Sequence, residues 1–263
     1  MGWLTGKNVV ITGASSGIGK EMAYEIAAHG GRPILLARRA PLIEEIAADI
    51  CENFSIEALA FVLDVADESA VVKVFERIKE AVGFVDVLIN NAGFALFKSV
   101  GETTYEESVS MMQVNVVGLM TCTAVVLKEM MKENRGHIIN VASIIGKIPT
   151  PKATTYAATK HAVLGYTNGL RMELSKTNIC VSAVNPGPIR TEFFDLADTS
   201  GNYKKNIEKM MLDPTVVAKR TVGLIKTGKR ELNLPWWMGI GGKFYAVAPV
   251  LMERTLGERL FQK

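Results

Sequence analysis

The chain alternates regularly between short apolar runs and longer amphipathic stretches, and this alternation constrains its fold more than any other feature. The apolar runs contain few polar residues, which is typical of parallel strands covered on both faces. These runs are Asn8–Thr12, Pro33–Ala37, Ala58–Leu63, Val85–Ile89, His137–Val141, Cys180–Val184 and Glu231–Leu234. The helical patterns between them are Gly19–His29, Pro41–Cys51, Glu68–Ala81, Tyr105–Lys132, Thr155–Lys176 and Pro214–Lys226. This order predicts a doubly wound α/β fold with a parallel sheet of about seven strands.

The length of 263 residues suits one domain of this kind, and the chain contains no repeat, low-complexity tract or linker. We therefore expect residues 1–263 to form a single domain. The net charge of +3 arises from basic and acidic residues that are spread along the chain. Such a distribution does not form a basic footprint, so we expect no nucleic-acid partner.

The three cysteines, Cys51, Cys122 and Cys180, do not form a C-x-x-C pair. Neither a disulfide framework nor a metal site is indicated, and a reducing compartment such as the cytoplasm is the expected setting. The N-terminus lacks the pattern of a signal peptide. The chain also lacks a run of about 18 uncharged apolar residues, so we expect no membrane-spanning helix.

A glycine-rich turn, TGASSGIG, joins the first strand to the first helix. Gly13, Gly17 and Gly19 have no side chains that would keep the backbone away from a phosphate, and they permit unusual φ angles. The helix that follows offers free N–H groups and a positive dipole end to an anion. Ser15 and Ser16 add hydroxyl donors. A glycine turn in this position of an α/β chain predicts a dinucleotide-binding Rossmann fold.

Two arginines, Arg38 and Arg39, follow the second strand, where an NAD site would carry an acidic residue for the ribose 2′-hydroxyl. A guanidinium matches a phosphate in both charge and shape. The sequence therefore favours NADP over NAD. The alternative is that both arginines are ordinary solvated charges at the start of a helix.

Tyr156 and Lys160 lie four residues apart in a helical pattern, so both side chains project from one face. A nearby ammonium stabilises the tyrosinate and lowers the pKa of the tyrosine, which suits it to proton transfer. Ser143 follows a predicted strand, at the sheet edge where ligands collect. Its hydroxyl is placed to hydrogen-bond a substrate oxygen. Each residue alone would more often belong to an ordinary core, and it is the combination that indicates chemistry.

These motifs together resemble the short-chain dehydrogenase/reductase family, of the common non-extended type, over nearly all of residues 5–234. The matching elements are Thr12-Gly-x-x-x-Gly-x-Gly19, Asn90-Asn-Ala-Gly93, Asn115, Ser143, Tyr156-x-x-x-Lys160 and Pro186-Gly187. The resemblance implies an NADP-preferring oxidoreductase that moves a hydride between the nicotinamide and a carbonyl or alcohol.

The resemblance also implies roles for individual positions. Lys160 would hold the nicotinamide ribose, and Asn115 would break its helix locally and hold a water that links Lys160 to solvent. The expected catalytic residues are Asn115, Ser143, Tyr156 and Lys160. The expected cofactor contacts are Gly13, Ser15, Ser16, Gly17, Ile18, Gly19, Arg38, Arg39, Asp64, Val65, Asn91, Ala92, Gly93, Tyr156, Lys160, Pro186, Gly187, Ile189 and Thr191.

The segment 192–212 corresponds to a mobile substrate lid in this family. Its apolar residues, with others from earlier loops, predict a largely apolar ketone, aldehyde or secondary alcohol as substrate. Residues assigned to substrate contact are Ser143, Ile145, Tyr156 and Phe193. Further candidates for the lining are Phe94, Phe97, Ile144, Pro149, Phe194, Leu196, Met210 and Met211, beside polar Asp195, Asp198 and Asn202. Any one of these apolar side chains could equally be an ordinary core residue.

Two further segments suggest contacts outside the monomer. The stretch Val114–Leu127 is apolar almost all round, which predicts either burial within the monomer or a subunit interface of a homodimer or homotetramer. The tail 235–263 carries several aromatic residues with Lys243 and Arg254. We expect the tail to pack on the domain or on a partner, and a membrane surface is the less favoured alternative. A regulator that binds NADP without turnover is the main alternative to an enzyme.

Overall fold

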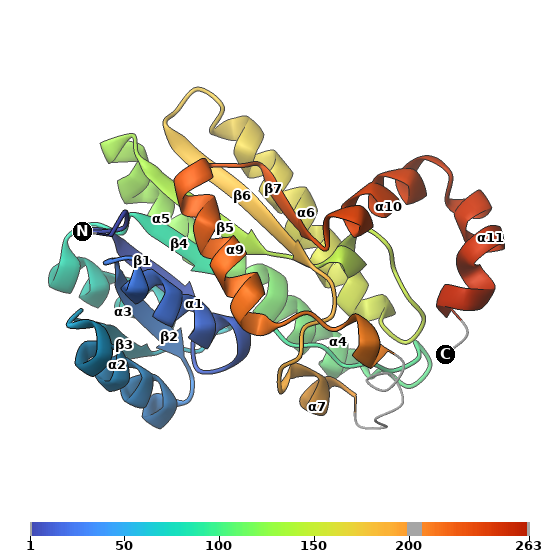
Figure 1. The fold of residues 1–263 in the computed structure, drawn as a ribbon, viewed down its shortest axis with the longest axis horizontal. Coiled ribbons are helices and arrows are strands. Elements are labelled where there is room, and N and C mark those ends of the chain that lie inside the picture. The colour runs from blue at the N-terminus through green and yellow to red at the C-terminus, as the bar shows by residue number, and fades with distance from the viewer. Residues whose placement is uncertain (1, 199–206, 262–263) are drawn as a thin grey trace.

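The computed structural model describes residues 2–198 and 207–261, and at its centre is a parallel sheet of seven strands in the order β3-β2-β1-β4-β5-β6-β7 (Figure 1). The strands are β1 Asn8–Thr12, β2 Arg32–Ala37, β3 Leu59–Val62, β4 Val87–Asn90, β5 Gly136–Val141, β6 Ile179–Pro186 and β7 Glu231–Leu234. The predicted Rossmann-type α/β fold is confirmed.

Helices cover both faces of this sheet (Figure 1). They are α1 Gly17–Ala28, α2 Ala40–Phe54, α3 Glu68–Val82, α4 Tyr105–Met112, α5 Leu119–Glu133, α6 Thr154–Glu173, α7 Phe193–Ala197, α9 Pro214–Thr227, α10 Trp236–Val247 and α11 Pro249–Phe261. Val9 and Ile11 of β1 pack in one core cluster with α1, α2 and α9, whereas Val10 packs in a second cluster with α3, α5 and α6. Alternate residues of a strand point to opposite faces, so strands buried on both faces are apolar at most positions.

The strand order reverses at β1, which pairs with β2 on one side and with β4 on the other. The loops that follow β1 and β4 therefore leave the sheet in different directions. A crevice at the carboxyl ends of the strands is expected at such a switch point, and ligands bind there in open α/β sheets. The glycine turn follows β1 and the segment Asn91–Gly93 follows β4, so both border this crevice.

The long helix expected at Tyr105–Lys132 consists of three parts. A π-helix, η1, spans Gln113–Gly118 and lies between α4 and α5. The whole run, Tyr105–Glu133, is the one helix in the described ranges that is long and apolar enough to cross a membrane, whereas the sequence predicted no such helix. Its most apolar window is 44% buried in the protein, and Asn115 and Thr123 are fully buried. A core helix passes the same test, so this is weak evidence for a span.

Candidate active site

The turn between β1 and α1 is shaped so that only glycine fits at its key positions. Gly13 and Gly17 have positive φ angles of 68° and 54°. A Cβ on Gly13 would lie 2.8 Å from the Cα of Ala92, and one on Gly19 would lie 2.2 Å from the Gly13 carbonyl oxygen. The three glycines therefore let the turn fold against the β4 loop while its backbone stays accessible at the start of α1.

Asn91 and Thr12 tie this turn to the end of β4. The Asn91 side-chain amide donates to the carbonyl oxygens of Thr12 and Gly13 at 3.0 and 3.1 Å. The Thr12 hydroxyl accepts from the backbone N–H groups of Asn91 and Ala92, both at 3.0 Å. The Asn91 side chain thus fixes the turn by hydrogen bonds, and the Ala92 backbone packs against Gly13.

The two arginines after β2 lie at the same edge of the sheet but differ in their contacts. Arg39 donates from Nη2 to the hydroxyls of Ser15 and Ser16 at 2.9 and 2.8 Å. Arg38 is 76% exposed, and its guanidinium lies 3.9 Å from the Asp64 carboxylate. The positive charge of Arg39 and both hydroxyls therefore converge at the N-terminus of α1, where the helix dipole also favours an anion.

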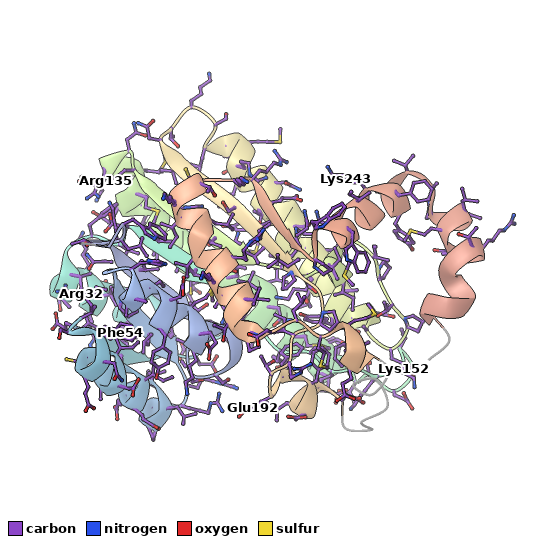
Figure 2. The ribbon with its side chains drawn as sticks, in the orientation of Figure 1. Arg32, Phe54, Arg135, Lys152, Glu192 and Lys243 are labelled. Atoms are coloured by element: carbon purple, nitrogen blue, oxygen red, sulfur yellow. The ribbon has the colours of Figure 1, made fainter. Side chains whose placement is uncertain are left out.

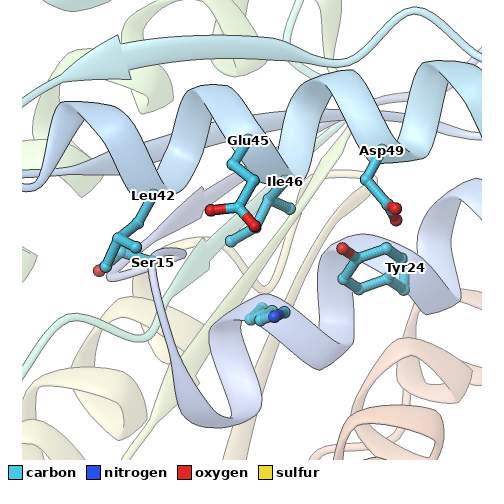
Figure 3. Close-up of a pocket in the computed structure, with 7 residues that line it drawn as sticks. Ser15, Tyr24, Leu42, Glu45, Ile46 and Asp49 are labelled. Carbon is cyan, nitrogen blue, oxygen red and sulfur yellow. The ribbon is translucent and has the colours of Figure 1, made fainter.

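A pocket of 230 Å³ lies next to this group, between α1 and α2, and Ser15 is one of its lining residues (Figure 3). Its other lining residues are Lys20, Tyr24, Leu42, Glu45, Ile46 and Asp49. Burial, together with a hydrogen bond to Asp49 and nearby carboxylates, raises the pKa of Tyr24 to about 12. Tyr24 therefore stays protonated at neutral pH and bridges the two helices.

Tyr156 and Lys160 lie on the first turns of α6, as their spacing predicted. Lys160 is only 4% exposed, and its ammonium donates to the Val141 carbonyl oxygen at 2.9 Å. The Lys160 nitrogen lies 5.8 Å from the centre of the Tyr156 ring. Burial lowers the pKa of Lys160 to about 8, because an ammonium loses hydration in the interior. The positive charge near the phenol is thus held in a site of low polarity.

Asn115 is fully buried in η1 and binds the loop that follows β4. Its side-chain oxygen accepts from the Phe94 N–H at 2.9 Å, and its amide donates to the Phe94 carbonyl oxygen and the Thr159 hydroxyl at 2.8 and 3.1 Å. A Cβ on Gly93 would lie 2.9 Å from the Asn115 oxygen and 3.5 Å from the Lys160 nitrogen. Gly93 therefore allows Asn115 and Lys160 to approach the same loop. The local helix break expected at Asn115 is present as the π-helix.

Ser143 follows β5 and begins the short 3-10 helix η2, Ile144–Gly146. Its hydroxyl donates to the Pro186 carbonyl oxygen at 3.3 Å and accepts from the Ile145 N–H at 3.2 Å. Ile145 is buried in the same apolar cluster as Tyr156. Ser143 thus lies at the junction of β5, β6 and the Tyr156 cluster.

Aromatic rings surround Tyr156. Phe97 meets it edge-on with ring centres 6.1 Å apart, and Phe193 lies at 6.0 Å. Phe194 stacks on Phe97 at 5.7 Å. The Phe97 N–H donates to the Ala197 carbonyl oxygen at 2.8 Å, which attaches α7 to the loop after β4. The phenol of Tyr156 is therefore set in an apolar, largely aromatic environment.

Of the other residues in segment 192–212 that were expected to line the pocket, some contact the Tyr156 cluster and others do not. Leu196 and Met210 are exposed, and so is Pro149 of the loop after η2. All three, expected as pocket lining, lie at the surface; Leu196 does so because α7 buries Phe194 and Ala197 instead. Met211 packs against the Tyr156 cluster. Asn202 lies outside the described residues.

The segment after β6 approaches the glycine turn at Thr191. The Thr191 methyl group would lie 3.3 Å from a Cβ on Gly17. Ile189 forms a β-bridge with Leu212, and the Gly187 N–H donates to the Leu234 carbonyl oxygen at 2.6 Å. Residues from β1, β4, β5, β6 and α6 therefore meet at one edge of the sheet.

The sequence did not predict a set of contacts that fix the end of η2, the turn that follows Ser143. Lys147 forms an ion pair with Glu231 of β7 at 2.6 Å, with the side chains 14% and 23% exposed. The His161 ring donates from Nδ1 to the Gly146 carbonyl oxygen at 2.9 Å. Glu231 lies 84 residues after Lys147, and His161 lies 15 residues after Gly146, so no local sequence pattern indicated these contacts.

Comparisons with known proteins identify the family of this chain. Residues 7–200 match the model of the family described as short chain dehydrogenase. The chain belongs to the short-chain dehydrogenase family. Relatives include the NADP-dependent 3-hydroxy acid dehydrogenase of Schizosaccharomyces pombe, 40% identical over 73% of this chain and 75% of that one. An uncharacterized oxidoreductase of Staphylococcus saprophyticus is 35% identical over 83% of this chain and 91% of its own.

Solved structures of this family superpose closely on the chain. A short-chain dehydrogenase from Sphingobium yanoikuyae in complex with NADPH is 26% identical, with a TM-score of 0.79 over 93% of this chain and 96% of that one. A family member from Burkholderia phymatum in complex with NAD has a TM-score of 0.87 over 96% of this chain and 97% of its own. At 23% identity, that second likeness shows the fold alone.

Proposed function

We propose that this short-chain dehydrogenase interconverts a carbonyl compound and an alcohol with NADP(H), using Tyr156 as the general acid or base. The observation that carries the proposal is the meeting of Tyr156, Lys160, Ser143 and Asn115 at the sheet edge that the glycine turn also borders. Mutual geometry of this kind distinguishes a site from separate core residues.

The chain's own residues divide the chemistry between them. Tyr156 gives a proton to the substrate oxygen during reduction or takes one during oxidation. The Lys160 ammonium favours the tyrosinate electrostatically, which suits Tyr156 to proton transfer. The Ser143 hydroxyl turns from Pro186 to the substrate oxygen and stabilises the charge that develops there. When bound, NADPH supplies the hydride. Asn115 holds the loop of Phe94 in place and, we propose, orients a water beside Lys160.

NADP is the proposed cofactor because the residues at the expected adenosine end suit a 2′-phosphate. The glycine turn has no room for Cβ atoms at Gly13 and Gly19. Beside it lie the guanidinium of Arg39 and the hydroxyls of Ser15 and Ser16. Arg38 precedes Arg39 in the chain and is exposed, and we propose it as the second charge at this phosphate. The S. pombe relative is named as NADP-dependent, which supports the same choice.

The apolar surroundings of Tyr156 support a hydrophobic ketone, aldehyde or secondary alcohol as substrate. The name of the S. pombe relative suggests a 3-hydroxy acid instead. A substrate panel distinguishes them: we expect higher kcat/KM for aryl or long-chain ketones and alcohols than for short 3-hydroxy acids. The opposite ranking would overturn the assignment of substrate class.

We further propose that the protein works in the cytoplasm as a homodimer or homotetramer. The outer side of the run Tyr105–Glu133 exposes several large apolar side chains, and exposed apolar patches often mark interfaces. These are Val109, Met112, Val117, Met120 and Met131. A second copy that packs on this side would complete the burial that the sequence of the helix predicts.

The Tyr156→Phe variant tests the acid–base assignment most directly. Loss of the hydroxyl removes the proton donor but leaves the ring in the aromatic cluster. We expect kcat to fall by about a hundredfold or more, while NADPH binding, measured by fluorescence, stays within a few-fold of the parent. A variant that keeps most of its turnover would show that the proton comes from elsewhere.

A further inference from the structure

The helix α10 carries most of its large apolar side chains on the side that faces solvent, which is the reverse of a core helix. Met238, Gly239 and Gly242 are its buried residues. The half-exposed or more exposed residues are Trp236, Trp237, Ile240, Phe244 and Val247, followed by Val250 and Leu251 of α11. The glycines permit close packing on the body: a Cβ on Gly239 would meet Asn233 of β7, and one on Gly242 would meet Lys147.

The exposed apolar residues of α10 form one continuous stripe. At 100° per residue, Trp236, Ile240, Phe244 and their neighbours fall within an arc of roughly 100° that lies opposite Met238. Lys243 falls at the border of this arc. A lysine in that position can rest its methylenes on apolar material and keep its ammonium in a polar layer. Figure 2 shows Lys243 on α10 at the outer margin of the molecule.

The charges of the tail select one kind of partner. Residues 235–252 contain no acidic side chain, and Lys243 is their only basic one. Residues 235–263 as a whole contain four basic side chains against two acidic ones. One of the two acids, Glu253, accepts a hydrogen bond from the Tyr245 hydroxyl at 2.9 Å, a contact that joins α10 to α11. A positive bias around an aromatic stripe complements an anionic lipid surface.

We propose that α10 and the start of α11 dock this protein on the surface of an anionic lipid bilayer. The 12 residues of α10 form a helix only about 18 Å long, which is too short to span a hydrocarbon core of about 30 Å. The helix therefore lies flat, with its tryptophans at the level where indole rings are favoured in membranes. Because α10 directly follows β7, docking brings the carboxyl edge of the sheet toward the bilayer.

The test uses the full-length protein and vesicles of phosphatidylcholine with or without phosphatidylserine. We expect co-sedimentation with the serine-containing vesicles and a weaker association with the neutral ones. The Ile240→Glu/Phe244→Glu variant should bind at least about tenfold more weakly, and Lys243→Glu should lose most of the preference for anionic vesicles. The matched control is Val72→Glu, an exposed apolar residue of α3, which should bind like the parent.

A second measurement uses the fluorescence of the tryptophans. The chain contains three of them, so Trp3→Phe leaves only the two in the tail. Their emission should shift to shorter wavelength with anionic vesicles. Unchanged emission, or equal sedimentation of parent and Ile240→Glu/Phe244→Glu, would overturn the proposal. If the parent does not bind vesicles, and Ile240→Glu/Phe244→Glu changes the number of subunits in the absence of lipid, the stripe is instead an interface with a second copy. Both readouts are independent of turnover, so they separate this inference from the proposed enzymatic activity.

Discussion

At the scale of single residues, the chemistry of this protein depends on where a few charges are held. Both arginines are exposed, but Arg39 contacts the serines of the glycine turn and Arg38 faces Asp64. The sequence indicated that a phosphate clamp follows β2 but treated both arginines alike. Their separate contacts now predict separate effects on cofactor choice.

We expect Arg39→Ala to weaken NADPH binding by about 10- to 100-fold, because charge-assisted hydrogen bonds are worth about 1.5–3 kcal/mol. NADH binding should change little, since that cofactor has no 2′-phosphate. Arg38→Asp should shift preference toward NADH by repelling the phosphate. Dissociation constants for both cofactors, measured by nicotinamide fluorescence, check the two variants. Equal losses for NADPH and NADH would contradict the clamp.

Lys160 allows a prediction about pH. Its pKa is about 8 in the folded protein and 10.5 ordinarily, so between these values the unfolded chain binds a proton that the folded one does not. Stability should therefore rise with pH from about 8 to about 10.5, by up to about 1.4 kcal/mol per pH unit. Urea melts of the parent and of Lys160→Met should diverge over this range, whereas the exposed Lys20→Met should follow the parent. A constant difference between the parent and Lys160→Met would argue against a buried ammonium.

At the scale of elements, the site is assembled from segments that support one another across the sheet. The π-helix η1 brings Asn115 to the loop after β4, and the Lys147–Glu231 ion pair connects the Ser143 turn to β7. Burial pushes the pKa of Glu231 up, but the hydrogen bond and charge of Lys147 outweigh it and hold that pKa below its usual range. The contribution of this pair to stability is therefore present at neutral pH and lost as the pH falls through the lowered pKa.

We expect Glu231→Gln and Lys147→Met each to lower stability by about 1–3 kcal/mol, because each leaves a half-buried partner without its counter-charge. Both should lower kcat more than they raise KM, since the Ser143 hydroxyl loses its fixed position. The reversed pair, Lys147→Glu with Glu231→Lys, should recover part of both losses. Thermal melts and steady-state kinetics provide the check. Single variants that match the parent in kcat would limit the pair to a structural role.

At the scale of the whole molecule, two apolar surfaces extend beyond the core: the outer side of Tyr105–Glu133 and the stripe on α10. We assign the first to a second copy and the second to lipid. Val117→Glu/Met120→Glu should shift sedimentation from the dimer or tetramer toward the monomer, because it places carboxylates in a desolvated contact. Val72→Glu on α3 should leave the subunit number unchanged. An assembly that survives Val117→Glu/Met120→Glu would place the interface elsewhere.

The sequence alone determined the fold and the motif residues, for a local physical reason. Strand-to-helix alternation and strands apolar on both faces are short-range patterns, and the four-residue spacing of Tyr156 and Lys160 fixes their common face on a helix. The glycine turn is likewise a local signal, because residues with a Cβ rarely adopt the backbone conformation that the turn requires. The family and the Rossmann sheet are confirmed, while the roles of the site residues stay predictions.

Only the tertiary structure decided the contacts between residues far apart in the chain. It separated Arg39 from Arg38, paired Lys147 with Glu231, and placed Phe97 and Phe193 around Tyr156 while leaving Leu196 and Met210 at the surface. It also turned the aromatic side of α10 outward, because the glycines of that helix pack closely against β7 and Lys147. Such choices depend on which surfaces meet after the sheet has formed, and the order of residues along the chain does not encode that locally.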